Sequence, residues 1–424
     1  MKQLISCYAL IASLLLGCNA PEEKNPQSKA LTQDAPTLAA LQVWGDSLAA
    51  RLRAYPRDAF KGQWSIQALH NTMQAYGLPE RLVEDYNPDE WEYNFSELLT
   101  EYLNWTPKSN KNYAGFYRYY HDSLGAAHMV LHTHNLQGAH IFDFTVAQEA
   151  NTLAITDVYL YDMSLSLSAL MVRKVGYLQR EHFGYPEVAL PLRTMATNRG
   201  RYYATFKGLV GPRRSLNYDY EVLHQLPKAF RKDPAWHAAR YRTAASKSAE
   251  TRLQHLNHWE ARFPGSPAAL FYRNQLQTES RLVSGQQLAS TLDALEKQVG
   301  LGPSLVHDRL SHQVGQIPTE KREANIREAI ATYPNFHPLY YRLIYVLAEQ
   351  QDWDGLALAL TDAYQHADLS MAEVDYTTFP EFLETTQAHA VADAQGLSIE
   401  AMLYYHDQEG EWPTLGREPL YALK

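Results

Sequence analysis

The chain has 424 residues, with 38 basic and 47 acidic side chains and a formal net charge of −9. This acidic balance argues against general binding to nucleic acids or to anionic lipid surfaces, because both require a basic protein surface. Apolar residues make up 46% of the chain, as in globular proteins, and the length allows two or three domains with cores of their own.

The first 18 residues have the pattern of an export signal. Lys2 precedes an apolar run from Leu4 to Leu16, which is shorter than the roughly 20 residues that span a bilayer. The segment Leu15-Leu16-Gly17-Cys18 resembles the lipobox of bacterial lipoproteins. The resemblance implies that residues 1–17 are a cleaved signal peptide and that Cys18 carries acyl chains such as palmitate, which attach the protein to a membrane of the cell envelope.

Residues 18–36 are predicted to be a disordered tether, because they are polar, rich in proline and free of aromatic side chains. A flexible coil of this length reaches on the order of 25 Å. Asn19 is not the aspartate that retains lipoproteins in the inner membrane, so the outer membrane, on its periplasmic or surface face, is favoured. Cys7 leaves with the leader and Cys18 carries lipid, so the mature fold is expected to have no disulfide.

Residues 37–185 are expected to form an α+β domain. Apolar residues recur at helical spacing up to about residue 104, and β-rich runs follow at 116–120, 129–132, 141–146 and 153–161. Residues 165–177 return to helical spacing. We expect helices packed on one face of an antiparallel meander, in a roll of the cystatin-like or NTF2-like kind.

Residues 186–234 read as a loop-rich connector, because proline and glycine interrupt them repeatedly. Helices are predicted over residues 235–410, before a tail at 411–424. A segment starting at Phe263-Pro264 is echoed by one starting at Tyr333-Pro334, and the interval of 70 residues is twice 35. This pattern resembles tetratricopeptide repeats (TPR), which recur at about 34 residues as helix pairs. The resemblance implies an all-α, TPR-like solenoid, and a generic solenoid of helical hairpins is the alternative.

One short motif raises the possibility of catalysis. Gly45-Asp46-Ser47-Leu48 matches the motif of a large family of serine esterases. However, the apolar spacing around Ser47 predicts a helix interior, whereas a nucleophile needs an exposed turn between a strand and a helix. The Asp-x-x-His of that family is also missing, so no catalytic residue is predicted.

Three histidines alternate along one predicted strand. His128, His132 and His134 share a parity, so their side chains are expected on one face, where three imidazoles can bind zinc or copper. The interpretation favoured from the sequence is a polar face in contact with solvent, opposite Met129 and Leu131. No metal or other cofactor is therefore predicted.

These patterns favour a non-enzymatic, membrane-anchored scaffold that binds a protein or peptide partner through its helical repeats. Two alternatives stay open from the sequence. One is a glycan-binding surface lipoprotein, suggested by 8 Trp and 29 Tyr residues. The other is a hydrolase that uses Ser47 or the histidine-rich strand. The sequence does not identify the partner, and it predicts no nucleic-acid ligand.

Overall fold

The computed structural model describes most of the chain between residues 35 and 399. The described residues are 35–56, 58–76, 78, 80, 83, 87–103, 112–135, 138–149, 152–178, 232–244, 247–280, 285–313 and 316–399. The lipobox, most of the tether, nearly all of the connector and the C-terminal tail lie outside them, as do the domain boundaries expected at 185 and 410.

The N-terminal part contains a five-stranded antiparallel sheet in the order β1-β2-β3-β4-β5. The strands are β1 (Tyr113–His121), β2 (Ala127–Asn135), β3 (Gly138–Glu149), β4 (Thr152–Leu160) and β5 (Leu165–Ser166). Each strand pairs with the next along the chain, which confirms the predicted meander. Alternation places Met129 and Leu131 on one face of β2 and Val130 on the other.

Helices of the N-terminal part cover the first face of the sheet. They are α2 (Leu38–Ala54), α3 (Ile66–Ala75), α5 (Pro88–Leu103) and α6 (Leu167–Leu178). Their apolar residues form one continuous core with Met129, Leu131 and Phe144 of the sheet. The expected α+β arrangement, with helices on one face of a meander, is confirmed.

The C-terminal part is helical, as predicted. Its elements are α10 (Pro234–Thr243), α11 (Ala249–Arg262), α12 (Pro267–Glu279), α13 (Gly285–Val299), α14 (Pro303–His312), α15 (Thr319–Thr332), α16 (His337–Glu349), α17 (Trp353–Ala367), the 3-10 turns η6 (Met371–Glu373) and η7 (Pro380–Glu384), and α18 (Thr386–Gln395). Consecutive helices pack against one another along this series. Both segments of the sequence echo fall at turns that lead into a helix, before α12 and before α16.

Four of these helices begin in the same way. Helices α10, α12, α14 and α16 each have a proline in their first turn, where its missing N–H costs no hydrogen bond. The prolines are Pro234, Pro267, Pro303 and Pro338, at intervals of 33 to 36 residues. The helical part therefore consists of helix pairs of nearly constant length.

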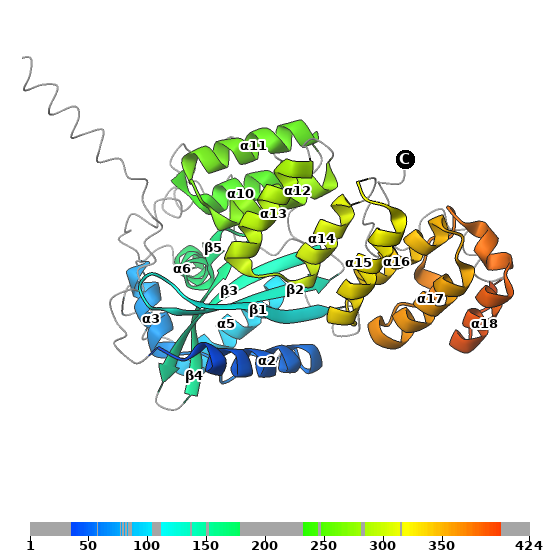
Figure 1. The fold of residues 1–424 in the computed structure, drawn as a ribbon. Coiled ribbons are helices and arrows are strands. Elements are labelled where there is room, and N and C mark those ends of the chain that lie inside the picture. Colours follow the sequence, from blue (N-terminus) through cyan, green and yellow to red (C-terminus); the bar gives the residue numbers. More distant parts are fainter. Residues whose placement is uncertain are drawn as a thin grey trace, which may run out of the picture.

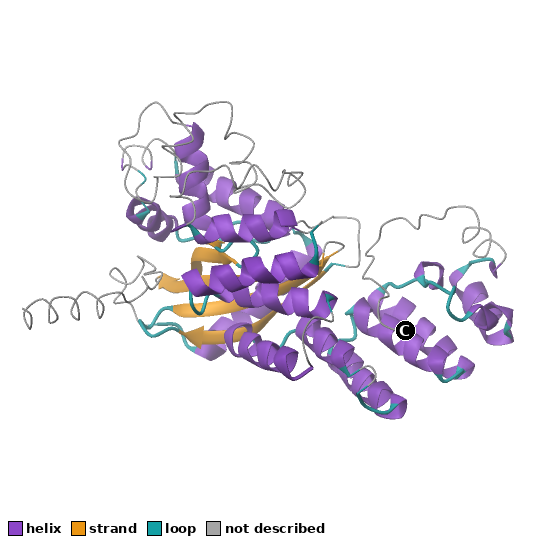
Figure 2. Cartoon of the chain, turned by 90° about the horizontal axis from the view of Figure 1, so that it is seen from above, coloured by secondary structure: helices purple, strands orange, loops and turns teal. Residues whose placement is uncertain are grey.

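The helical part covers the second face of the sheet (Figure 1). Val130 and Ile141 of the sheet share one apolar core with residues of α10 to α14, such as Trp259 and Leu292. Seen from above, helices lie across the strands, while the series of helices continues beyond the sheet (Figure 2). Among the described residues, none of the helices has the length and apolar character needed to cross a membrane.

Candidate functional site

The three histidines of β2 lie on the buried second face of the sheet. Every residue of β2 is buried, and His132 is only 2% exposed. The prediction that these histidines form a polar face in contact with solvent is therefore wrong. Alternation correctly places the three imidazoles on one face, but the helical part is docked on that face.

His128 belongs to a hydrogen-bonded group within the sheet. Its Nδ1 lies 3.0 Å from Asp143 Oδ1, and the Tyr120 hydroxyl donates to Asp143 Oδ2 at 2.6 Å. The rings of Tyr120 and His128 are stacked, with centroids 4.7 Å apart. Burial by itself lowers the pKa of His128, but the hydrogen bond and charge of Asp143, with Asp122, raise it above the usual value. This group is an internal ion pair that links β1, β2 and β3.

His132 and His134 instead contact the turns of the helical part. His132 Nε2 donates to the Val299 carbonyl at 2.8 Å, and the ring of His134 packs edge-on against Phe336, with centroids 5.1 Å apart. Burial lowers the pKa of His132 to about 4 and that of His134 to about 3. Because the three histidines have separate partners, they do not converge, and the described residues contain no group of three or more His, Cys, Asp or Glu arranged to hold a metal ion.

Ser47 is an exposed residue within α2, as the spacing predicts. Gly45, from the same motif, has a packing role. A Cβ atom at Gly45 would lie 2.8 Å from the Tyr119 hydroxyl oxygen, so the absence of a side chain lets α2 approach β1. The glycine of the esterase-like motif is therefore accounted for by the close contact between α2 and β1.

The strongest candidate site is a row of polar side chains across the first helices of the helix pairs. Arg240, Asn274, Asp308 and Arg342 recur at a constant interval of 34 residues, one each on α10, α12, α14 and α16. We call these four residues the polar row. Because one helix pair occupies about this interval, they lie on the first helices of successive pairs, four to seven residues after the proline in the first turn of each helix.

A hydrogen bond joins the two central members of the polar row. Asn274 Nδ2 donates to Asp308 Oδ2 at 2.7 Å, although the residues belong to different helices. Burial raises the pKa of Asp308 to about 6, against the opposing effects of the Asn274 hydrogen bond and the positive charge of Arg342. Arg240 lies over the ring of Trp236, with its Cζ 5.2 Å from the centroid. The row therefore has a positive member at each end and a carboxylate between them.

Beside the polar row, buried polar atoms have no hydrogen-bond partner among the described residues. They are Asn274 Oδ1, Gln277 Oε1 and His312 Nε2. Asn274 and Gln277 are 2% and 6% exposed, and His312 is half-buried. Each such atom carries a desolvation cost of about 1–3 kcal/mol. Two acceptors on α12 and an imidazole nitrogen on α14 are thus buried with no hydrogen-bond partner among the described residues.

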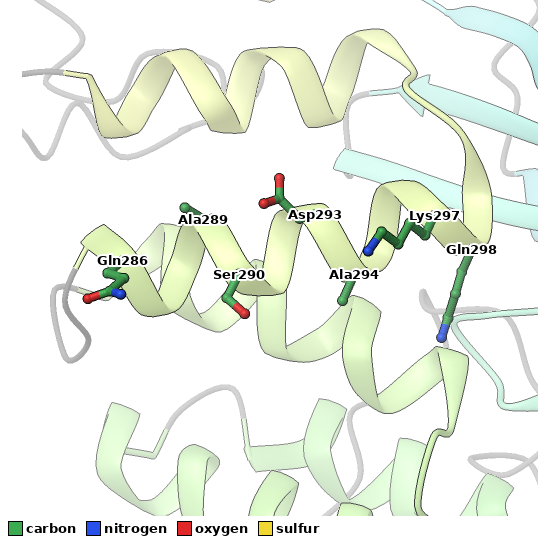
Figure 3. Close-up of a pocket in the computed structure, with 7 residues that line it drawn as sticks. All are labelled: Gln286, Ala289, Ser290, Asp293, Ala294, Lys297 and Gln298. Atoms are coloured by element: carbon green, nitrogen blue, oxygen red, sulfur yellow. The ribbon is translucent and has the colours of Figure 1, made fainter.

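A shallow groove of about 630 Å³ lies on a different surface, along α13. Figure 3 shows its seven lining residues spaced along that one helix. They are Gln286, Ala289, Ser290, Asp293, Ala294, Lys297 and Gln298. Because the lining combines small and polar side chains without a buried acid, base or nucleophile, the groove offers no site for catalysis.

No protein-family model, curated protein or solved structure matches the chain. The function is therefore inferred from the fold and from the contacts of the described residues. The polar row was missed at the sequence level, although its 34-residue interval is present in the sequence. The row can be found in the sequence by comparing every residue with the residues 34 and 68 positions further along the chain.

Proposed function

We propose that the protein is a non-enzymatic scaffold, anchored by lipid on Cys18 in the cell envelope, that binds an extended polypeptide along the polar row. The observation that carries the proposal is the polar row itself, in which the half-buried side chains of Arg240, Asp308 and Arg342 lie on α10, α14 and α16. A polypeptide in extended conformation presents polar and charged groups at regular intervals, which suits polar side chains placed on successive helix pairs. The helix-pair interval supports a TPR-like solenoid as the framework.

The charges of the row restrict the partner. Arg240 and Arg342 favour acidic groups at the two ends of the bound segment, and Asp308 between them favours a donor or a basic side chain. The long side chains of Arg240 and Arg342 are half-buried, so binding orders them at a smaller entropic cost than fully exposed side chains. Affinity is expected to come from several such contacts along the array.

The alternatives have less support from the described residues. Trp64, Trp91, Trp236 and Trp259 are buried in the cores, so they are not a surface for stacking on sugars. Ser47 lies inside a helix, and the histidines of β2 are covered. Binding of a polypeptide is therefore the function that we favour.

Peptide display against the mature chain tests the proposal. Selected peptides should bind the wild type, and affinity measured by fluorescence polarisation should fall about tenfold or more for Arg342→Ala and for Asn274→Leu. Ser290→Leu, in the groove of α13, is the matched control and should bind normally. Peptides that bind all three variants as tightly as the wild type would refute the proposal.

A further inference from the structure

The interface between the sheet and the helical part contains a group of imidazoles that we call the histidine seam. Its members are His132 and His134 on β2, His307 on α14 and His337 on α16. The Phe336 ring lies between two of them, 5.1 Å from the ring of His134 and 6.5 Å from that of His307. The rings of His134 and His337 are 5.6 Å apart. Four titratable groups thus connect two parts of the chain that are far apart in sequence.

His132 is fixed in its neutral form by the turn between α13 and α14. Its Nε2 carries the proton donated to the Val299 carbonyl, which leaves Nδ1 to accept a proton from acid. Nδ1 faces Gly302 so closely that a Cβ atom there would lie 2.1 Å away. On the β1 side, the Tyr117 ring packs against His132 at 5.1 Å. Protonation would therefore place a charge in a site lined by backbone and an aromatic ring.

The ionisable groups that act on His134 are other imidazoles. They are His307 from α14 and His140 from the neighbouring strand β3, and His337 of α16 lies against its ring. His134 Nδ1 has no hydrogen-bond partner among the described residues and is buried. His140 pairs with Asp162, and His307 Nδ1 lies 3.6 Å from Asp308 Oδ1. Besides burial, the nearby imidazoles of His307 and His140 lower the pKa of His134, because positive charge on them opposes a charge on His134.

We propose that the histidine seam is an acid-sensitive latch, which holds the helical part on the sheet at neutral pH and releases it when the imidazoles become protonated. The proposal does not depend on the proposed function. An imidazole that is neutral when buried and free to ionise when exposed favours the open form as the pH falls below 6.5. At pH 5.0, each such histidine should raise the ratio of open to closed molecules by up to about 30-fold.

Hydrogen–deuterium exchange of the mature full-length chain tests the latch. Amides of residues 305–307, at the start of α14, should exchange faster at pH 5.0 than at pH 7.5 after correction for the intrinsic rate. Amides of residues 386–395 in α18, away from the seam, serve as the internal reference. An unchanged corrected rate at residues 305–307 in the wild type would overturn the proposal.

Two substitutions separate the seam from other effects of acid. His134→Phe retains a ring against Phe336 but cannot ionise, and His132→Gln retains a donor for the Val299 carbonyl. Each should reduce the acid-induced increase several-fold, whereas His389→Phe at an exposed position of α18 should not. If His134→Phe fails to fold, the His132→Gln variant and the pH dependence of exchange in the wild type still test the latch. An undiminished increase in the variants would contradict the latch.

Discussion

Asn274 and Asp308 lie on the first helices of two successive helix pairs, and the side chain of Asn274 donates a 2.7 Å hydrogen bond to the carboxylate of Asp308. Asn274 is nearly inaccessible, and the Asp308 side chain is 20% exposed. A hydrogen bond to a largely buried carboxylate has a large effect when it is broken, because the remaining acceptor loses its partner. This contact links α12 to α14.

We predict that Asn274→Leu lowers the free energy of unfolding by about 1–3 kcal/mol at pH 7.5. The double variant Asn274→Leu/Asp308→Leu should lose less than the sum of the two single changes, because no carboxylate is then left without its partner. Urea denaturation of the four proteins measures the coupling. Strict additivity would show that the contact has no energetic role.

The same carboxylate should affect the pH dependence of stability in a defined direction. The pKa of Asp308 is about 6 in the fold, above its usual value of 3.8, so the folded protein binds this proton more tightly than the unfolded chain does. Its contribution to stability is therefore complete below pH 3.8 and is lost as the pH rises through 6. Asp308→Asn should flatten the decline between pH 4 and 6.5 in urea midpoints. An unchanged slope would contradict the assignment.

The turn between α13 and α14 should be sensitive to a single methyl group. Gly300 has φ +80°, and a Cβ atom there would lie 2.4 Å from the Tyr117 carbonyl oxygen of β1. Gly265, in the turn before α12, has φ +78° and open space around it. Both Gly→Ala variants incur the cost of a left-handed backbone, but only Gly300→Ala also pushes against the sheet.

We expect Gly300→Ala to be less stable than Gly265→Ala by about 1–3 kcal/mol, because the additional methyl group meets a backbone atom that cannot move aside easily. The two variants are matched in backbone conformation, so their difference isolates the contact between turn and sheet. Thermal unfolding monitored by circular dichroism measures it. Equal losses would mean that the turn does not press on β1.

Gly45 provides a test of the contact between α2 and the sheet. In an exposed helix, Gly→Ala stabilises by about 1 kcal/mol, but here the new methyl group meets the Tyr119 hydroxyl. We predict that Gly45→Ala destabilises the protein and that adding Tyr119→Phe recovers part of the loss. Ser47→Ala should change stability by less than about 0.5 kcal/mol, since the side chain is exposed. A stabilising Gly45→Ala would remove the packing explanation.

The proposed anchor leads to a separate prediction. Cys18→Ala should abolish acylation and move the protein from the detergent phase to the aqueous phase in Triton X-114 partitioning, since the acyl chains supply the membrane affinity. Residue 18 precedes the first described element, so the far-ultraviolet circular dichroism of the variant should be unchanged. Labelling with a palmitate analogue provides the chemical readout. Continued labelling of Cys18→Ala would disprove lipidation at this position.

Local patterns were sufficient to predict the secondary structure. Alternation from Met129 to His132 and helical spacing from Leu41 to Leu52 both reflect one buried face, and that information is local. What covers the other face of β2 depends on residues more than 160 positions away, such as Val299, which bonds to His132. Alternation shows that two faces differ but does not show what packs on either.

The candidate site was harder to predict for a different reason. Neighbouring members of the set Arg240, Asn274, Asp308 and Arg342 are separated by the same interval but differ in residue type, so a search for repeated letters does not detect them. The echo at Phe263 and Tyr333 was visible because aromatic and proline residues recur there as packing and turn residues. Binding surfaces vary between helix pairs, whereas the packing that holds the pairs together is repeated.

Photo-crosslinking in intact cells tests the central claim most directly. A photoreactive amino acid replaces Ser311, one helical turn from Asp308 on α14, and a control protein carries it at Ser290 in the groove of α13. We predict that the probe at position 311 captures a discrete polypeptide, that Arg342→Ala abolishes this product, and that the probe at position 290 does not yield it. Equal capture at both positions, or capture unaffected by Arg342→Ala, would contradict a binding face along the polar row.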